Sequence, residues 1–211
     1  MKHGLLFDLD GTLWDATLAI IPAWNAVLKR FGSLRAPLTW EDIRGYMGKT
    51  SIQIAALMLP GHPIHDSLAI VNACCEEELP RLREQGGRLY PHITETLEQL
   101  RQSGYFLYIV SNCQDGYIEA FLQHHGLASF FEDYEYEGRT GRPKGENIRL
   151  VMERHGLDRA VYIGDTQGDL EAAELAGIPF IHAAYGFGRV DRDVPAIWEP
   201  RDLLKRLRSF F

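Results

Sequence analysis

The sequence contains few cysteines and no long apolar run. Cys74, Cys75 and Cys113 are the only cysteines among 211 residues. Such a sparse, odd-numbered set argues against a disulfide framework and fits a reducing compartment. No apolar stretch approaches the roughly 20 residues that a membrane helix needs. The N-terminus runs directly into Asp8 and Asp10 without the basic leader of a signal peptide. We therefore expect a cytoplasmic protein with no membrane partner.

An excess of basic residues is also missing. The chain has 22 Lys and Arg residues against 29 Asp and Glu residues, and its formal net charge is −7. A general nucleic-acid binder needs a basic face, so we expect no nucleic-acid partner. An anionic small molecule remains compatible with this charge, because a local cation or a metal ion can reverse the field inside a cleft.

Short apolar runs alternate with helical patterns along most of the chain. Four runs predict buried strands, at residues 4–9, 105–110, 160–164 and 178–183, and residues 133–136 fit a short edge strand. Helical patterns cover residues 92–102, 117–125, 146–155 and 168–176, each closely followed by a glycine. Strands that alternate with helices imply a parallel sheet covered on both faces. We predict an α/β fold with a doubly wound parallel sheet.

A long helical segment interrupts this alternation after the first strand. Residues 15–86 show helical periodicity and no convincing strand, with Thr39 placed to cap a helix. The apolar face of one cap helix contains Leu68, Val71, Cys75, Leu79 and Leu82. A crossover helix needs only about a dozen residues, so this segment predicts an inserted subdomain. We assign residues 1–14 and 87–211 to the core and residues 15–86 to a helical cap, with a hinge at Gly86-Gly87.

Two carboxylates follow the first predicted strand, in the run Asp8-Leu9-Asp10-Gly11-Thr12. Residues two apart in an extended segment point the same way, so Asp8 and Asp10 would repel each other unless a cation lay between them. Oxygen ligands of this kind suit a hard metal ion such as Mg²⁺. Gly11 lets the backbone turn closely around an anion. An exposed Asp-Gly turn is the alternative, but a buried strand running into the whole motif favours the metal site.

Polar residues also follow three later strands. They are the pair Ser111-Asn112, then Lys144, and the pair Asp165 and Asp169, which lie four residues apart. Taken singly, each has a plainer explanation, as a capping pair, a solvated basic turn or a helix N-cap. Ligands of open parallel sheets bind at the carboxyl ends of the strands, so we expect these patches to meet in one crevice.

The four motifs in this order resemble the haloacid dehalogenase superfamily, and the helical insertion resembles its phosphoglycolate phosphatases and β-phosphoglucomutases. The resemblance implies that Asp8 attacks phosphorus and becomes an aspartyl-phosphate, and that Asp10 serves as general acid and base. It implies a Mg²⁺ cofactor held by Asp8, the Asp10 backbone carbonyl and Asp165, with Asp169 in support. Related dehalogenases lack a carboxylate at the position of Asp10, so its presence argues for phosphate esters.

The same resemblance assigns the phosphoryl group to Ser111, Asn112 and Lys144, with Gly11 and Thr12 also in the substrate-binding set. Many capped relatives have Lys-Pro in the third motif. This chain has Arg142-Pro143-Lys144-Gly145, which leaves Arg142 as an alternative to Lys144. Lys49 lies in the cap at the position of a substrate-specificity loop, although an exposed lysine between cap helices would look the same.

These features predict a Mg²⁺-dependent phosphatase that hydrolyses a small phosphorylated metabolite, a phosphomonoester. A phosphomutase of the β-phosphoglucomutase type would use the same nucleophile and is the first alternative. A non-catalytic domain that binds a phospho-ligand is the second. A cap that closes over Asp8 would exclude bulk water and select the substrate. The protein is expected to be a monomer or a homodimer.

Overall fold

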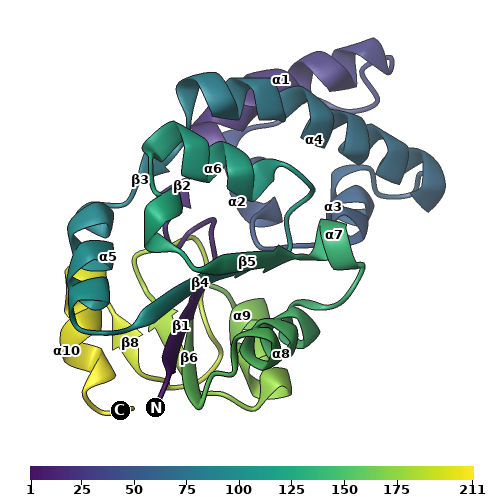
Figure 1. Cartoon of the computed structure of the whole chain (residues 1–211). Coiled ribbons are helices and arrows are strands. Elements are labelled where there is room, and N and C mark those ends of the chain that lie inside the picture. Colours follow the sequence, from purple (N-terminus) through teal and green to yellow (C-terminus); the bar gives the residue numbers. More distant parts are fainter.

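The computed structural model describes all 211 residues and divides them between a sheet-based lobe and a helical lobe (Figure 1). The main sheet has six strands in the order β5-β4-β1-β6-β7-β8, and every pairing is parallel. Its strands are β1 (His3–Phe7), β4 (Phe106–Ser111), β5 (Asp133–Tyr136), β6 (Arg159–Gly164), β7 (Phe180–Ala183) and β8 (Ala196–Ile197). The predicted doubly wound α/β fold is confirmed.

Helices cover both faces of the sheet, as the continuous apolar strands predict. In β1, Leu5 and Phe7 belong to the larger apolar cluster, whereas Leu6 belongs to the smaller one on the opposite face. Helices α5 (Ile93–Gln102), α6 (Tyr117–His125) and α10 (Leu203–Leu207) contribute to the larger cluster. Helices α8 (Lys144–His155) and α9 (Gln167–Ala176) contribute to the smaller one. Figure 1 shows these two groups on opposite sides of the strands.

The helical lobe is inserted after β1. It consists of α1 (Thr17–Arg30), α2 (Trp40–Tyr46), α3 (Ser51–Met58) and α4 (Ile64–Gln85). The predicted helix cap at Thr39 is confirmed. Its side chain accepts a hydrogen bond from the Asp42 backbone N–H, and the Asp42 carboxylate accepts one from the Thr39 backbone N–H. The predicted apolar face of α4 packs in the large cluster, with Val71, Cys75 and Leu82 buried.

A small two-stranded ribbon joins the two lobes. Strand β2 (Trp14–Asp15) pairs antiparallel with β3 (Arg88–Leu89), directly after Gly86 and Gly87. Trp14 is buried edge-on against three rings of α6. A Cβ atom on Gly87 would come within 2.8 Å of the Trp14 ring, so a larger residue would force the two connecting segments apart. This ribbon therefore ties the helical lobe to the core at a fixed place.

Several element boundaries differ from the expectations. Helix α8 begins at Lys144 instead of residue 146, and β1 ends at Phe7 instead of residue 9. The sequence analysis did not anticipate β2, β3, β8, α10, the short helix α7 (Glu137–Thr140) or the 3₁₀ turns Ala128–Phe130 and Pro200–Asp202. These elements span two to five residues, which is too short for a hydrophobic period to develop. None of the helices combines the length and the apolar character needed to cross a bilayer.

Candidate active site

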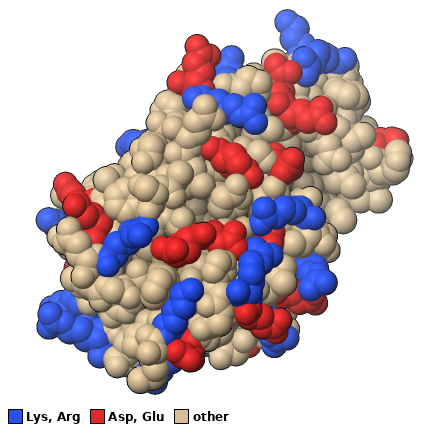
Figure 2. All heavy atoms as spheres, viewed as in Figure 1, with Lys and Arg blue, Asp and Glu red and all other residues tan.

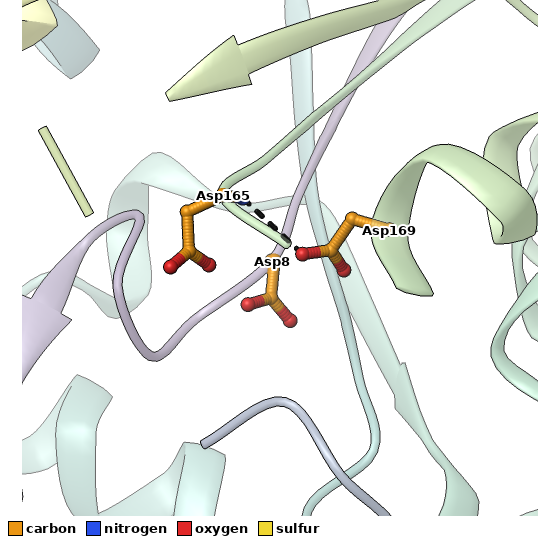
Figure 3. A group of neighbouring side chains, drawn as sticks. All are labelled: Asp8, Asp165 and Asp169. Atoms are coloured by element: carbon orange, nitrogen blue, oxygen red, sulfur yellow. Dashed lines mark hydrogen bonds between the residues drawn. The ribbon is translucent and has the colours of Figure 1, made fainter. Parts of the chain in front are cut away.

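Strand order brings the predicted motifs together. Strand β1 lies between β4 and β6, so the carboxyl ends of these three strands are neighbours. Asp8 follows β1, Ser111 ends β4, and Asp165 follows β6. Carboxylate oxygens of Asp8, Asp165 and Asp169 all lie within 4.8 Å of one another, and all three residues are buried. Figure 3 shows the three carboxyl groups gathered at this edge of the sheet.

Lys144 supplies a fixed positive charge to this acidic group. Its Nζ lies 2.7 Å from Asp8 Oδ1 and 2.6 Å from Asp169 Oδ1, and only 4% of the side chain is exposed. Burial by itself lowers the pKa of Lys144, but the carboxylates of Asp169 and Asp8 outweigh it and raise the pKa well above its usual value. Arg142 is exposed and forms no ion pair. The cation beside Asp8 is thus Lys144.

Both side-chain oxygens of Asp169 already have partners. Oδ1 accepts from Lys144, while Oδ2 accepts from the Thr166 amide at 2.9 Å and the Thr166 hydroxyl at 2.7 Å. A longer bond of 3.2 Å from the Asp165 amide, drawn in Figure 3, completes the set. Thr166 and Asp169 form the capping box of α9. Asp169 therefore caps the helix and positions Lys144 at the same time.

A glycine-rich loop holds Asp165 from one side. Its Oδ2 accepts from the amides of Phe187 at 2.7 Å and Gly188 at 3.1 Å, but its Oδ1 is buried without a hydrogen-bond partner. A Cβ atom on Gly11 would lie 2.2 Å from Asp165 Oδ2, and one on Gly186 would lie 2.3 Å from the Gly11 carbonyl oxygen. Only glycine lets these two turns approach the carboxylate this closely.

The unpartnered oxygens fit a hard divalent cation. Asp8 Oδ2 and Asp165 Oδ1 are both buried without a hydrogen bond. Burial and the charge of Asp169 raise the pKa of Asp8 to about 7, although Lys144 acts in the opposite direction. A cation held by Asp8 and Asp165 would compensate this desolvation, and an all-oxygen donor set is what Mg²⁺ prefers. The residues present therefore fit the predicted Mg²⁺.

Asp10 follows Asp8 by two residues and has a different hydrogen-bond partner. Its Oδ1 accepts from the Tyr117 hydroxyl at 2.9 Å, and 9% of the residue is exposed. Burial and the neighbouring Asp8 raise the pKa of Asp10 to about 7. A carboxyl group with a pKa near neutrality can both donate and accept a proton at working pH. The sequence analysis missed Tyr117, because a tyrosine at a helix start carries no signal of this contact.

Two cavities open between the helical lobe and the core. The larger, of about 640 Å³, lies between cap residues 44–53 and core residues including Asn112, Lys144 and Thr166. The smaller, of about 50 Å³, is bordered by Asp10, Ser111 and Asn112 from the core. Lys49 borders both cavities, so the structure places the predicted cap residue at the site. One hydrogen bond from Asn112 Nδ2 to the Gly48 carbonyl at 2.9 Å helps to hold the lobes together.

Five predicted site residues border neither cavity, namely Asp8, Gly11, Thr12, Asp165 and Asp169. Gly11 packs against Asp165, and Thr12 is fully buried, with its hydroxyl unpartnered and its carbonyl accepting from Tyr185 at 2.8 Å. Their assignment to substrate binding stays a prediction. Glu78, a buried residue of α4, borders the smaller cavity and was not anticipated. A single glutamate in a cap helix has no sequence signal that it faces a site.

Comparison with known proteins places this geometry in a family. The family described as haloacid dehalogenase-like hydrolase matches residues 5–183. The chain belongs to this family. The motifs at Asp8, Ser111, Lys144 and Asp165 all fall inside the matched range. The predicted family and the expectation of a hydrolase are confirmed.

Relatives of similar length share the family. A phosphoglycolate phosphatase of Rhodobacter capsulatus is 30% identical over 203 residues, covering 92% of this chain and 89% of the relative. One of Vibrio parahaemolyticus serotype O3:K6 is 28% identical over 198 residues, covering 87% and 84%. A haloacid dehalogenase-like family hydrolase of Streptococcus pneumoniae superimposes with a TM-score of 0.80 at 25% identity, covering 100% of this chain and 99% of that one. This haloacid dehalogenase-like hydrolase thus has phosphatases among its relatives.

Proposed function

We propose that this hydrolase is a Mg²⁺-dependent phosphatase that cleaves a small phosphomonoester through a phosphorylated Asp8. The observation that carries the proposal is the state of the Asp8 carboxylate. One of its oxygens is held by Lys144, while the other is buried without a partner, as is one oxygen of the neighbouring Asp165. Such a carboxylate is fixed in place and has one oxygen available for a metal or a phosphorus atom.

The residues that would hold Mg²⁺ are Asp8, Asp165 and the backbone carbonyl of Asp10, with Asp169 as a supporting carboxylate. The structure supports this division of roles, because both carboxylate oxygens of Asp169 already accept hydrogen bonds, one from Lys144 and the other from Thr166 at the start of α9. A bound Mg²⁺ would supply positive charge that offsets the repulsion between the phosphate and the carboxylates. Ser111, Asn112 and Lys144 are proposed to hold the remaining phosphoryl oxygens.

The reaction has two steps in this proposal. An Asp8 oxygen forms a bond to phosphorus while the ester P–O bond breaks, and Asp10 gives its proton to the leaving alkoxide. Asp10 then takes a proton from water as that water attacks the phosphorus, which releases phosphate and restores Asp8. The hydroxyl of Tyr117 orients Asp10 in both steps, because it donates to Asp10 Oδ1 and leaves Oδ2 free for the proton.

The size of the substrate is proposed from the cavities. Asp10 borders the smaller cavity, so the alcohol portion that it protonates lies there. A volume of about 50 Å³ is enough for roughly three to five water-sized groups. Relatives named phosphoglycolate phosphatase support a substrate of this size.

The experiment is phosphate release from p-nitrophenyl phosphate and a panel of small phosphomonoesters, with and without Mg²⁺. Asp8→Asn is expected to lose activity while keeping its fold, because it is nearly isosteric. Arg142→Ala is the matched control and should stay close to wild type, because Arg142 is exposed and unpaired. A phosphomutase would convert its substrate to an isomer with little free phosphate. Asp8→Asn with wild-type turnover would contradict the proposal.

We further propose a cytoplasmic monomer or homodimer that acts on a small phosphorylated metabolite. The three cysteines are unpaired, which fits a reducing compartment. Acidic and basic side chains are interspersed on the face shown in Figure 2, without the broad basic field that nucleic acid would require.

A further inference from the structure

A cap arginine reaches across to the core loop that holds Asp165. Arg44, in the last turn of α2, donates from Nη2 to the backbone carbonyl of Phe187 at 2.9 Å. Phe187 belongs to the core and lies in the glycine-rich loop after β7. The side chain of Arg44 takes part in no ion pair. Its charge is therefore directed at one backbone group of the core.

The carbonyl that Arg44 contacts belongs to a peptide unit that binds Asp165. A peptide plane joins the carbonyl of one residue to the N–H of the next, so the Phe187 carbonyl and the Gly188 N–H turn together. This Gly188 N–H donates to Asp165 Oδ2 at 3.1 Å, beside the Phe187 N–H at 2.7 Å. Hydrogen bonds in series polarise one another, so a guanidinium on the carbonyl strengthens the donation to the carboxylate. Arg44 thus acts on Asp165 through the Phe187–Gly188 peptide.

Neighbouring contacts hold both ends of this connection. The Arg44 guanidinium lies 5.2 Å from the centroid of the Trp40 ring, and Trp40 Nε1 donates to Thr17 Oγ1 at 3.0 Å. On the core side, a Cβ atom on Gly188 would lie 2.7 Å from the Asp165 carbonyl oxygen, so the loop packs directly against the residue that it binds. A cap that moved away from the core would remove the Arg44 bond and free the peptide to turn.

Resting on the proposed Mg²⁺ site, we propose that Arg44 is a positioning residue that couples closure of the cap to Mg²⁺ binding. With the cap closed, the Phe187–Gly188 peptide fixes the carboxylate of Asp165 in one orientation. Coupling between two sites is reciprocal, so bound Mg²⁺ also favours the closed cap. Because the Arg44 contact is exposed, the expected effect lies at the lower end of the usual range, at about fivefold in affinity.

Calorimetric titration of the full chain with Mg²⁺ tests this coupling in wild type, Arg44→Met and Arg189→Met. Arg189 is the matched control, because it is exposed, follows Gly188 directly and borders the same larger cavity as Arg44. Loss of either positive charge would by itself tighten the binding of a cation. We expect Arg44→Met to weaken Mg²⁺ binding about fivefold, and Arg189→Met to leave it unchanged or tighten it. Arg44→Lys keeps a charged donor and should recover part of the loss.

Hydrogen exchange of the cap amides gives a second readout that does not depend on catalysis. Mg²⁺ should slow exchange in residues 44–50 of wild type and should slow it less in Arg44→Met. An unchanged Mg²⁺ Kd in Arg44→Met, or an equal weakening in Arg189→Met, would overturn the coupling and leave the proposed phosphatase standing. Equal Mg²⁺ binding by wild type and Asp165→Asn would instead overturn the metal site on which both proposals rest.

Discussion

Replacing Lys144 by methionine tests how the acidic cluster is held. Methionine nearly preserves the length and volume of the side chain but removes its charge. The lysine ammonium lies 2.7 Å from Asp8 Oδ1 and 2.6 Å from Asp169 Oδ1 at 4% exposure. With an effective dielectric constant of about 20, a pair at this distance attracts by roughly 6 kcal/mol, of which desolvation cancels a large part. Removing one partner of such a buried pair typically costs about 3–5 kcal/mol.

We therefore expect Lys144→Met to lower the free energy of unfolding by about 3–5 kcal/mol in the absence of Mg²⁺. Urea denaturation followed by circular dichroism measures this change. Mg²⁺ should restore part of the loss, because a cation between Asp8 and Asp165 compensates the charge that Lys144 no longer supplies. Phosphatase activity should fall about 100-fold or more even with Mg²⁺, since Lys144 is a preorganised charge beside the phosphoryl group.

Arg142→Met is the matched control, two residues away and exposed. It should change stability by less than about 0.5 kcal/mol, as surface substitutions usually do. A Lys144→Met variant that unfolds within about 1 kcal/mol of wild type would refute the idea that this lysine stabilises two buried carboxylates. Equal, mild losses of activity in both variants would show that neither Lys144 nor Arg142 binds the phosphoryl group.

Four further outcomes are expected. Tyr117→Phe should slow the phosphorylation step about 10-fold or more for esters with poor leaving groups but spare the first-turnover release of nitrophenolate from p-nitrophenyl phosphate, because only the former need the proton of Asp10; equal slowing of this first step would contradict this. Mg²⁺ at about 100 times its Kd should stabilise wild type by about 2.7 kcal/mol in thermal unfolding, and Asp165→Asn should lose most of that gain. Lys49→Ala should raise KM or change substrate choice more than it lowers kcat for p-nitrophenyl phosphate; unchanged kinetics on every ester would remove it from the site. For Glu78, whose pKa rises from 4.5 to about 8 on folding, the folded state keeps a proton that the unfolded state releases. Between pH 4.5 and about 8, the free energy of unfolding of wild type relative to Glu78→Gln should therefore fall by about 1.4 kcal/mol per pH unit. Urea denaturation of both proteins over this pH range measures the difference. A difference that does not change with pH would show that the pKa of Glu78 is not shifted.

The sheet and the acidic cluster were predictable because both depend on local pattern. Buried strands are short apolar runs, and in a parallel sheet their polar ends converge, which places Asp8, Ser111 and Asp165 at one edge. The start of α8 at Lys144 was harder to predict, because a cation opposes the dipole at a helix start. The structure shows the compensation in the two carboxylates that Lys144 contacts.

The contacts between cap and core were beyond prediction from one sequence. Glu78 is one of several acidic residues in α4, and only the packing of this helix against the loop after β4 shows that it meets Gln114. The two functions of Asp169 were equally hidden. Spacing placed it near Asp165, but capping and metal binding require the same residue type at the same position, and only the hydrogen bonds to Thr166 separate them.

The central claim is that Asp8 carries the phosphoryl group, and one experiment tests it directly. Asp10→Asn, mixed with p-nitrophenyl phosphate and Mg²⁺, should still release a first equivalent of nitrophenolate, because this leaving group needs no proton. Without Asp10 to activate water, the phosphorylated enzyme should accumulate. Acid quenching followed by peptide mass spectrometry should then locate one phosphoryl group on Asp8. A phosphoryl group on any other residue, or a first turnover without any adduct, would contradict the account.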